Sequence, residues 1–565
     1  MCYRKIRNSM NLRSVNLACF ALTSIFQLLA SVPAAEPLLQ LPLKNDARDA
    51  GPLKLEARAA DVRFESESAQ TGKKGSLATW NGRTSQVEII RDDRLAVRRG
   101  PFTVMARIDL TGSDDDLPGD IVNQFDHETG RGWMLSITSR SGLVHSRSNH
   151  RQIHFGVRNG DFDTPWTDHG RPGGSVYVQA MTVFDGSLYV GICDPSPTGK
   201  GGVFRFVPPD RWEDCRLPIT CNSVTSLTVH QGRLHAGSGK YRLAGSALAE
   251  SDNPQLGGEV FRMEPYGSWK NLGRLGESEA VGGLVVFQGR LHASSLYKPA
   301  GFFRLEDTGQ WTTLDTPGGK RPEALAVHND LLYATGYDEG HVYRYDGKSW
   351  TDLGAVGKNT QTYGFAVYRG ALYVSTWPEG KVYRLEEPAA WVDCGRLGEE
   401  LEVMGMAVHG GSLFGGTLPT GTVYRYQGGT RWIPAGNTDR TPDVKYRRAW
   451  SFAEFGGRLY CGTLPSGRVW SNEAGANVTY DRELADGLHH VAAVREGATL
   501  VLYLDGKEVA RRKSSEAEPF DLAPDASIRV GYGVHDSFRG QLGDVRLYRG
   551  ALTPKDIRAI ADEKP

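Results

Sequence analysis

Residues 165–174 read PWTDHGRPGG, in which Trp166 is followed four positions later by Gly170. The same spacing returns in WKNLGRLG, WTDLGAVG and WVDCGRLG, and each of these phrases closes a repeat of the chain. Trp166, however, precedes the first repeat. We interpret residues 165–170 as the last strand of a repeat whose other strands lie near the opposite end of the array.

The repeats themselves predict a β-propeller. A phrase of the type VFDGSLYVG occurs seven times, and each copy reads as two short strands joined by a tight turn. A strand with an aromatic residue follows each copy, and in six copies a strand with tryptophan comes next. Four short strands in roughly 40 residues make a propeller blade. The leucine of the phrase falls at Leu188, Leu234, Leu291, Leu332, Leu372, Leu413 and Leu459.

The seventh repeat has no tryptophan where one is due, near Val478, and Trp166 supplies it. An open ring would leave unpaired strand edges, so closure by strand exchange between the two ends is favoured. We therefore expect a seven-bladed β-propeller in residues 161–474, with its last blade closed by the strand at 165–170. The GG-x-L-[YF] phrase, the aromatic residue and the W-x-x-L phrase together resemble kelch-type repeats.

The flanks of the repeat array have a different pattern. GPFTVMARIDL and RGWMLSITS before it, and LHHVAAVREGATLVLYLDGKEVARR after it, read as strands joined by turns. They resemble the early and late strands of a LamG, or concanavalin A-like, jelly-roll domain, although Leu488 stands where the family often has Trp. The resemblance implies one β-sandwich in two halves, residues 36–160 and 475–565, the second ending in a short helix capped by Thr553. The expected fold is all-β, with the propeller inserted into the jelly roll.

Residues 1–35 predict a secretory signal peptide, because four basic residues precede the apolar run LACFALTSIFQLLASV and small residues follow at Ala34 and Ala35. The run is shorter than the roughly 20 residues that span a bilayer. We therefore expect a secreted or periplasmic protein without stable membrane insertion after signal removal; retention of the signal as an anchor is the alternative. The full chain has a net charge of zero, and loss of those four basic residues leaves −4. Without a basic stripe, nucleic acid is not an expected partner.

One face of the expected ring, here called the top face, is where the first strand of each blade begins. The starts of the inner strands, the loop that precedes the first strand of the seventh repeat, and the loops between second and third strands place polar and aromatic residues on the top face. Such surfaces suit sugars or peptides, although Tyr363 and Trp450 could simply fill the axis. The candidate ligand-binding residues are Gln179, Glu323, Tyr363, Trp377, Arg447, Arg448 and Trp450.

Two other patterns predict local chemistry. The acidic loop GSDDDLPGD indicates calcium in the LamG-like half, at Asp114, Asp116 and Asp120, since hard cations prefer several converging oxygens; a solvated loop is the alternative. Cys215 and Cys221 are near enough in sequence for a loop disulfide. No further cofactor is expected.

The sequence carries no G-x-S-x-G, P-loop or H-E-x-x-H motif, and Glu323 is the only acid expected in the inner ring. We therefore expect an exported non-catalytic protein that recognises a glycan or an extracellular protein through the LamG-like domain, the top face, or both. A carbohydrate-active hydrolase or lyase on the top face is one alternative, and an acidic pair beside Tyr363 and Trp450 would favour it. An envelope scaffold without a small ligand is the other.

Overall fold

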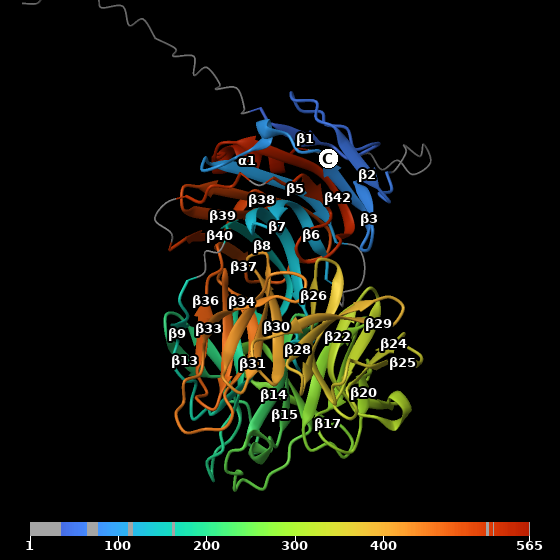
Figure 1. Ribbon diagram of the computed structural model, residues 1–565, viewed down its shortest axis with the longest axis vertical. Coiled ribbons are helices and arrows are strands. Elements are labelled where there is room, and N and C mark those ends of the chain that lie inside the picture. The colour runs from blue at the N-terminus through green and yellow to red at the C-terminus, as the bar shows by residue number, and fades with distance from the viewer. Residues whose placement is uncertain are drawn as a thin grey trace, which may run out of the picture. The chain divides into compact units, whose positions relative to one another are not determined.

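Strands from both ends of the chain share two seven-stranded antiparallel sheets, in a computed structural model that describes residues 36–64, 77–110, 117–160, 164–515, 519–523 and 525–563. Figure 1 shows the blue N-terminal and red C-terminal strands side by side in these sheets. The predicted signal peptide lies outside the described residues. The first sheet contains, in spatial order, β1 (Leu39–Leu41), β42 (Arg539–Arg549), β5 (Phe102–Asp109), β38 (Leu488–Glu496), β39 (Thr499–Leu504) and β40 (Lys507–Lys513), with β3 (Ala78–Asn81) also paired to β42. The second contains β2 (Ala57–Ala60), β4 (Gln86–Ile89), β41 (Ile528–Val530), β6 (Gly119–Asp126), β7 (Arg131–Arg140), β8 (Asn149–Asn159) and β37 (Ala476–Tyr480).

The two sheets enclose one apolar core. The ring centroid of Phe102 in β5 lies 5.6 Å from that of Trp133 in β7 and 6.0 Å from that of Phe155 in β8. Burying a side chain of this kind contributes roughly 1.5–3 kcal/mol. On the other face of the first sheet lies helix α1 (Pro554–Ala561), which buries Ile557 and Ile560. No helix among the described residues is long and apolar enough to cross a membrane.

The strands between these two groups form a β-propeller (Figure 1). One sheet has eight strands: β10 (Tyr177–Phe184), β11 (Ser187–Cys193), β12 (Gly202–Val207), β13 (Arg211–Asp214), β14 (Ser223–His230), β15 (Arg233–Gly239), β16 (Glu259–Met263) and β17 (Trp269–Arg274). Five sheets have four strands each. They are β18 (Val281–Phe287), β19 (Arg290–Ser295), β20 (Phe302–Leu305) and β21 (Trp311–Leu314); β22 (Pro322–His328), β23 (Leu331–Gly336), β24 (His341–Tyr345) and β25 (Trp350–Ala355); β26 (Gln361–Tyr368), β27 (Ala371–Trp377), β28 (Lys381–Glu386) and β29 (Ala390–Arg396); β30 (Glu402–His409), β31 (Ser412–Leu418), β32 (Thr422–Tyr426) and β33 (Trp432–Asn437); and β34 (Arg448–Phe455), β35 (Arg458–Leu464), β36 (Val469–Asn472) and β9 (Thr167–Asp168).

This pairing corrects the prediction of seven separate blades. Five four-stranded sheets stand apart, whereas the strands of the first two repeats belong to a single sheet. The physical cause is one ladder pair between Cys193, at the end of β11, and Ser223, at the start of β14. The resemblance to kelch-type repeats stays a prediction.

Seven tryptophans connect the outer strands of the propeller. Each indole Nε1 donates to a main-chain carbonyl on or beside the outer strand of the preceding repeat, at 2.8–3.3 Å. Trp166 belongs to this circuit, because its indole bonds the carbonyl of Ala435 while β9 pairs with β36 at Asp168 and Trp470. Around the ring the members are Trp212, Trp269, Trp311, Trp350, Trp391, Trp432 and Trp166.

Cys215 and Cys221 are free thiols, which corrects the predicted disulfide. The Sγ of Cys215 lies 3.8 Å from the carbonyl oxygen of Glu213, and that of Cys221 lies 3.7 Å from the carbonyl oxygen of Ser223. Both thiols belong to one apolar cluster. Burial there raises the pKa of Cys215 to about 12 and also raises the pKa of Cys221. Apolar packing, rather than a cross-link, therefore holds this segment.

Candidate functional site

β-Bulges place selected side chains of the inner strands at the propeller axis. The pairing register slips at the same place in the first strand of every repeat, for example between Val178 and Ala180 in β10. A bulge adds a residue to one strand and changes the direction of its side chain. The slipped segments contain four predicted site residues, Gln179, Glu323, Tyr363 and Trp450.

These side chains gather around Trp450. Its indole donates to the main-chain carbonyl of Gln179 at 3.0 Å, and its ring centroid lies 6.4 Å from that of Tyr363. The guanidinium of Arg448 lies 5.7 Å from the Trp450 ring centroid, a cation–π contact. All of these residues, and Glu323, are less than a tenth exposed. The structure thus brings these predicted residues together as a buried axial cluster rather than an open surface.

The axial cluster also contains Glu402, at the start of β30, so the prediction of a single acid in the inner ring is wrong. Its carboxylate lies 3.8 Å from the Arg448 guanidinium. Burial raises the pKa of Glu402, because loss of water disfavours the charged form, while Arg448 and Tyr363 oppose that shift. Glu402 lies two residues before Met404, which is the position of this strand that the sequence alignment assigned to the inner ring. An alignment that also included the residue two positions earlier in each inner strand would have found Glu402.

A loop of the jelly roll enters the propeller from the opposite side. Residues 141–148, which connect β7 to β8, exchange hydrogen bonds with the inner strands of five repeats. The donors and acceptors are Val183 N to Ser148 O (2.9 Å), Arg147 N to Leu227 O (3.1 Å), Leu284 N to His145 O (3.1 Å), Val327 N to Ser141 Oγ (3.0 Å) and Phe365 N to Gly142 O (2.8 Å). This segment, SGLVHSRS, has no periodicity that would predict such a position.

His145 at the centre of this loop reaches the axial cluster. Its Nε2 lies 3.1 Å from Glu323 Oε1, and both side chains are buried. The His145 ring centroid is also 6.1 Å from that of Trp450. One acid of the cluster therefore contacts a histidine of the jelly roll, and the other contacts Arg448.

Four half-buried aromatic side chains, Tyr297, Tyr337, Trp377 and Tyr446, pack against the axial cluster; we call them the aromatic rim. Three of them carry a cation over the ring: Arg242 at 5.6 Å from Tyr297, Arg321 at 4.2 Å from Tyr337 and Lys445 at 4.8 Å from Tyr446. Of the predicted site residues, Trp377 lies in the aromatic rim. Arg447 lies outside the rim, because its guanidinium donates to the carbonyl of Thr441 in its own loop at 2.6 Å.

An insertion in the second repeat, residues 240–257, covers part of the axial cluster. Arg448 donates to the hydroxyl of Tyr241 at 3.1 Å and to that of Ser246. Leu243 of the insertion is 1% exposed and packs in the same apolar cluster, and the backbone N–H of Arg242 donates to the hydroxyl of Tyr297 at 3.1 Å.

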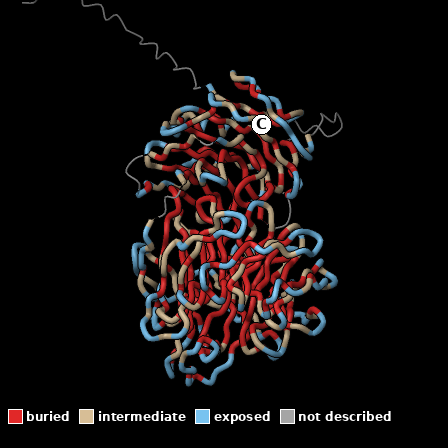
Figure 2. The backbone as a smooth tube through the Cα atoms, in the orientation of Figure 1, coloured by how far each residue is buried: buried red, intermediate tan, exposed pale blue. Residues whose placement is uncertain are grey.

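Figure 2 shows the buried segments along the inner strands and the exposed residues on the outer turns.

Some polar atoms of the axial cluster have no hydrogen-bond partner among the described residues. They are Gln179 Nε2, Glu323 Oε2, Arg448 Nε and the hydroxyl of Tyr177, whose ring centroid lies 5.3 Å from that of Trp450. A buried polar atom without a partner costs roughly 1–3 kcal/mol. The cluster therefore keeps buried donors and an acceptor that no described protein atom satisfies.

Asp120, a predicted calcium ligand, is fully buried beneath residues 535–537. It accepts hydrogen bonds from Ser136 Oγ (2.7 Å) and from the backbone N–H groups of His535 (2.7 Å) and Asp536 (3.1 Å). Burial alone would raise the pKa of Asp120, but His535 and these donors hold it below its usual range. Asp114 and Asp116 lie outside the described residues. In the part of the chain that is described, no three His, Cys, Asp or Glu side chains are arranged to hold a metal ion.

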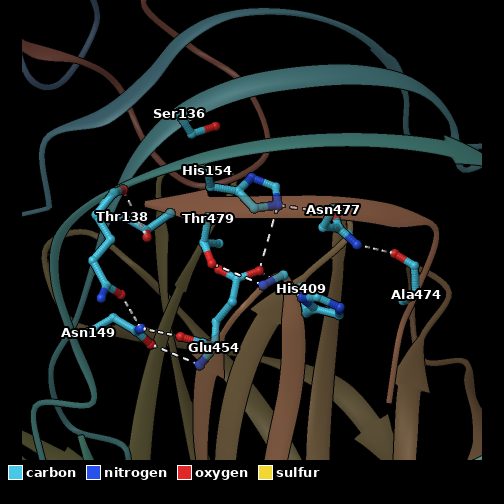
Figure 3. A network of polar contacts seen from close by, with 12 residues as sticks. Ser136, Thr138, Asn149, His154, His409, Glu454, Ala474, Asn477 and Thr479 are labelled. Atoms are coloured by element: carbon cyan, nitrogen blue, oxygen red, sulfur yellow. Dashed lines mark hydrogen bonds and ion pairs between the residues drawn. The ribbon is translucent and has the colours of Figure 1, made fainter. Parts of the chain in front are cut away.

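A second polar cluster lies between the second sheet of the jelly roll and the propeller (Figure 3). Glu454 accepts from Arg140 Nη2 at 2.9 Å and contacts His409 Nδ1 at 2.8 Å. The side-chain amide of Asn149 donates to the carbonyl of Glu454 at 2.8 Å, and His154 Nε2 lies 3.6 Å from its carboxylate. Burial opposes ionisation, but Arg140 and the two histidines hold the pKa of Glu454 well below its usual range. These contacts hold the two parts together.

Comparison with known proteins identifies one part of the chain. A family model described as the concanavalin A-like lectin/glucanases superfamily matches residues 446–558. No curated protein matches the chain. The chain therefore contains a concanavalin A-like domain together with a β-propeller.

Solved structures similar to this chain include a catalytically inactive virginiamycin B lyase from Staphylococcus aureus with quinupristin, at 12% identity and a TM-score of 0.42, over 55% of this chain and 99% of that one. A streptogramin B lyase is 10% identical with a TM-score of 0.44, over 55% and 97% of the two chains. A putative gluconolactonase is 13% identical with a TM-score of 0.31, over 55% and 91%. Similarity at this level carries no argument about activity.

Proposed function

We propose that the protein is an exported, non-catalytic binding protein that recognises carbohydrate through the aromatic rim of the propeller. The observation that carries this proposal is the rim itself: aromatic side chains from separate loops pack over a cluster with unpartnered polar atoms. Sugars place their apolar C–H faces on aromatic rings and need a few fixed hydrogen-bonding groups beside them. The concanavalin A-like domain is a second surface for such ligands. Export rests on the signal-peptide pattern of residues 1–35.

The proposal includes an architecture of seven blades inserted into one jelly roll. The eight-stranded sheet comprises two blades, β10–β13 and β14–β17, joined at the Cys193–Ser223 pair. The closed circuit of seven tryptophans supports this count, because each outer strand contributes one indole. Both jelly-roll sheets combine strands that precede and follow the propeller.

A glycan array with the compact unit, residues 36–565, tests the function. The variant Tyr337→Ala removes one rim platform, and Leu488→Ala removes an apolar side chain that is 44% exposed on the jelly roll and serves as the matched control. An aromatic contact is worth roughly 0.5–1.5 kcal/mol beyond area burial, so we expect Tyr337→Ala to weaken glycan binding by about tenfold and the control to retain it. Glycan binding unchanged in Tyr337→Ala but lost with EDTA would move recognition to calcium in the jelly roll. No glycan binding at all would refute the proposal.

A carbohydrate-active hydrolase or lyase is the second candidate, because Glu323 and Glu402 both lie in the axial cluster with Tyr363 and Trp450. Most glycoside hydrolases cleave the glycosidic bond with a pair of carboxyl groups that flank it. The contacts of Glu323 with His145 and of Glu402 with Arg448 favour binding instead. Incubation of array-positive glycans with the protein separates the candidates: product formation that disappears in Glu402→Gln would establish the enzyme.

A further inference from the structure

The jelly roll contacts the turn face of the propeller over some repeats and leaves others open. A Cβ atom built at Gly186, Gly370, Gly411 or Gly457, in the turns of the first, fifth, sixth and seventh repeats, would meet jelly-roll atoms within 4 Å. In the second and third repeats, a Cβ built at Gly232, Gly267 or Gly309 would meet no atom within 4 Å. The turns around the β16–β17 hairpin therefore face open space among the described residues.

Two grooves flank this hairpin. One, of about 760 Å³, lies toward the third repeat and is lined by charged side chains that include Arg233, Arg262, Lys270 and Arg290. The other, of about 1110 Å³, lies toward the first repeat and is lined by aromatic and apolar side chains that include Tyr189, Met263 and Trp269, together with charged ones. Tyr266 lines this second groove from the tip of the hairpin. The hairpin thus separates a charged groove from a more apolar one.

The charged groove has a surplus of positive charge. Its three acids are already bound: Glu264 accepts from Arg262 at 2.7 and 2.9 Å, and Glu306 and Asp307 contact Arg290. Arg233 and Lys270 form no ion pair within the described part of the chain. These two cations remain to attract an anionic group, and a groove with low-dielectric walls strengthens that attraction.

Tyr266 is presented to solvent at a conformational cost. Its exposed fraction is 108%, so the ring has no burial of its own. Its φ of 67° lies in the left-handed region, where the side chain of an ordinary residue crowds its own backbone. Strain of this kind is typical of binding sites. An aromatic ring held in this way is a platform on which a sugar ring can stack.

We propose that the β16–β17 hairpin binds an anionic polysaccharide, a ligand distinct from that of the aromatic rim. A sulfate or carboxylate group binds at Arg233 and Lys270, and a sugar ring stacks on Tyr266 as the chain crosses the hairpin from one groove to the other. The anion supplies charge recognition, and the ring distinguishes a polysaccharide from an acidic peptide. The site lies on the turn face, whereas the rim belongs to the top face.

Binding of three polysaccharides to residues 36–565 tests this site: dextran sulfate, polygalacturonate and neutral dextran, with poly-glutamate as the acidic peptide. We expect the Arg233→Ala/Lys270→Ala variant to weaken binding of the preferred polyanion by tenfold or more at low salt, and to flatten its salt dependence. The matched control, Lys358→Ala/Arg440→Ala, makes the same charge change at two exposed residues and should bind as the unchanged protein does. Comparison of dextran sulfate with polygalacturonate identifies the anion, and neutral dextran should not bind.

Tyr266→Ala separates the polysaccharide from a simple polyanion. We expect it to weaken polysaccharide binding several-fold and to leave any poly-glutamate binding unchanged. Polyanion binding that is unaffected by Arg233→Ala/Lys270→Ala would overturn the proposal, as would poly-glutamate binding that equals that of both polysaccharides. Tyr337→Ala should leave polyanion binding intact, so failure of the rim proposal and failure of this one are distinguishable.

Discussion

Removal of the Trp166 side chain should loosen the propeller at its closure. The indole is half-buried, packs against the apolar cluster that contains Ala449 and Phe452, and donates to the carbonyl of Ala435 at 3.0 Å. Full truncation of a buried Trp costs roughly 3–5 kcal/mol, and a half-buried one about half as much. Loss of the hydrogen bond adds about 1 kcal/mol. We therefore expect Trp166→Ala to lower the free energy of unfolding by about 2.5–3.5 kcal/mol.

Trp350→Ala is the matched control for this variant. Trp350 is also half-buried and donates to the carbonyl of Asp315 at 2.8 Å, but it belongs to a six-residue strand, β25. β9 has two residues and pairs with β36 alone. Both variants should lose similar stability in urea unfolding, yet only Trp166→Ala should speed amide hydrogen exchange in β36. A loss below about 0.5 kcal/mol, or unchanged exchange in β36, would refute the closure by Trp166.

Three other outcomes follow from the buried groups. Glu454→Gln should cost about 3–5 kcal/mol of unfolding free energy, because Arg140 stays buried without its carboxylate; urea unfolding measures this, and a loss below about 1 kcal/mol would contradict it. Burial lowers the pKa of His154 to about 4, so the unfolded chain binds a proton at this residue more readily than the folded protein does. The free energy of unfolding should therefore be unaffected by this group above pH 6.5 and fall by up to about 3 kcal/mol as the pH drops from 6.5 toward 4. Unfolding curves at several pH values should therefore show a shallower loss in His154→Gln, and identical losses would count against this shift. Thiol titration of unfolded, unreduced residues 36–565 should find five free cysteines, and three would restore the disulfide.

Much of the fold is readable in the sequence, because its strands repeat. The Leu188-type positions and the spaced tryptophans mark the strands of each repeat, and the structure has β-strands at those places. The sequence did not predict that the strands of the first two repeats share one sheet. This sharing depends on a single ladder pair, Cys193 with Ser223, and the periodicity of the repeats does not encode it.

The sequence alignment predicted which residues lie near the propeller axis but not what surrounds them. Gln179 and Trp450 lie in bulges of the inner strands, at the positions that the alignment of the repeats predicted. Their burial depends on the insertion at residues 240–257 and on the 141–148 loop. His145 meets Glu323 across 178 positions of sequence, and no local pattern predicts such a contact. Asp120 shows the same limit, because its acidic neighbours suggested a metal whereas its partners come from residues 535 and 536.

Calorimetric titration of the glycan that binds best on the array into the unchanged protein and its Trp377→Ala and Trp377→Phe variants tests whether the aromatic rim recognises carbohydrate. Trp377 belongs to the aromatic rim and carries no structural indole hydrogen bond of the tryptophan circuit. We expect a Kd about tenfold higher in Trp377→Ala and largely restored in Trp377→Phe, which keeps an aromatic face. Equal affinity in all three proteins would contradict recognition by the rim.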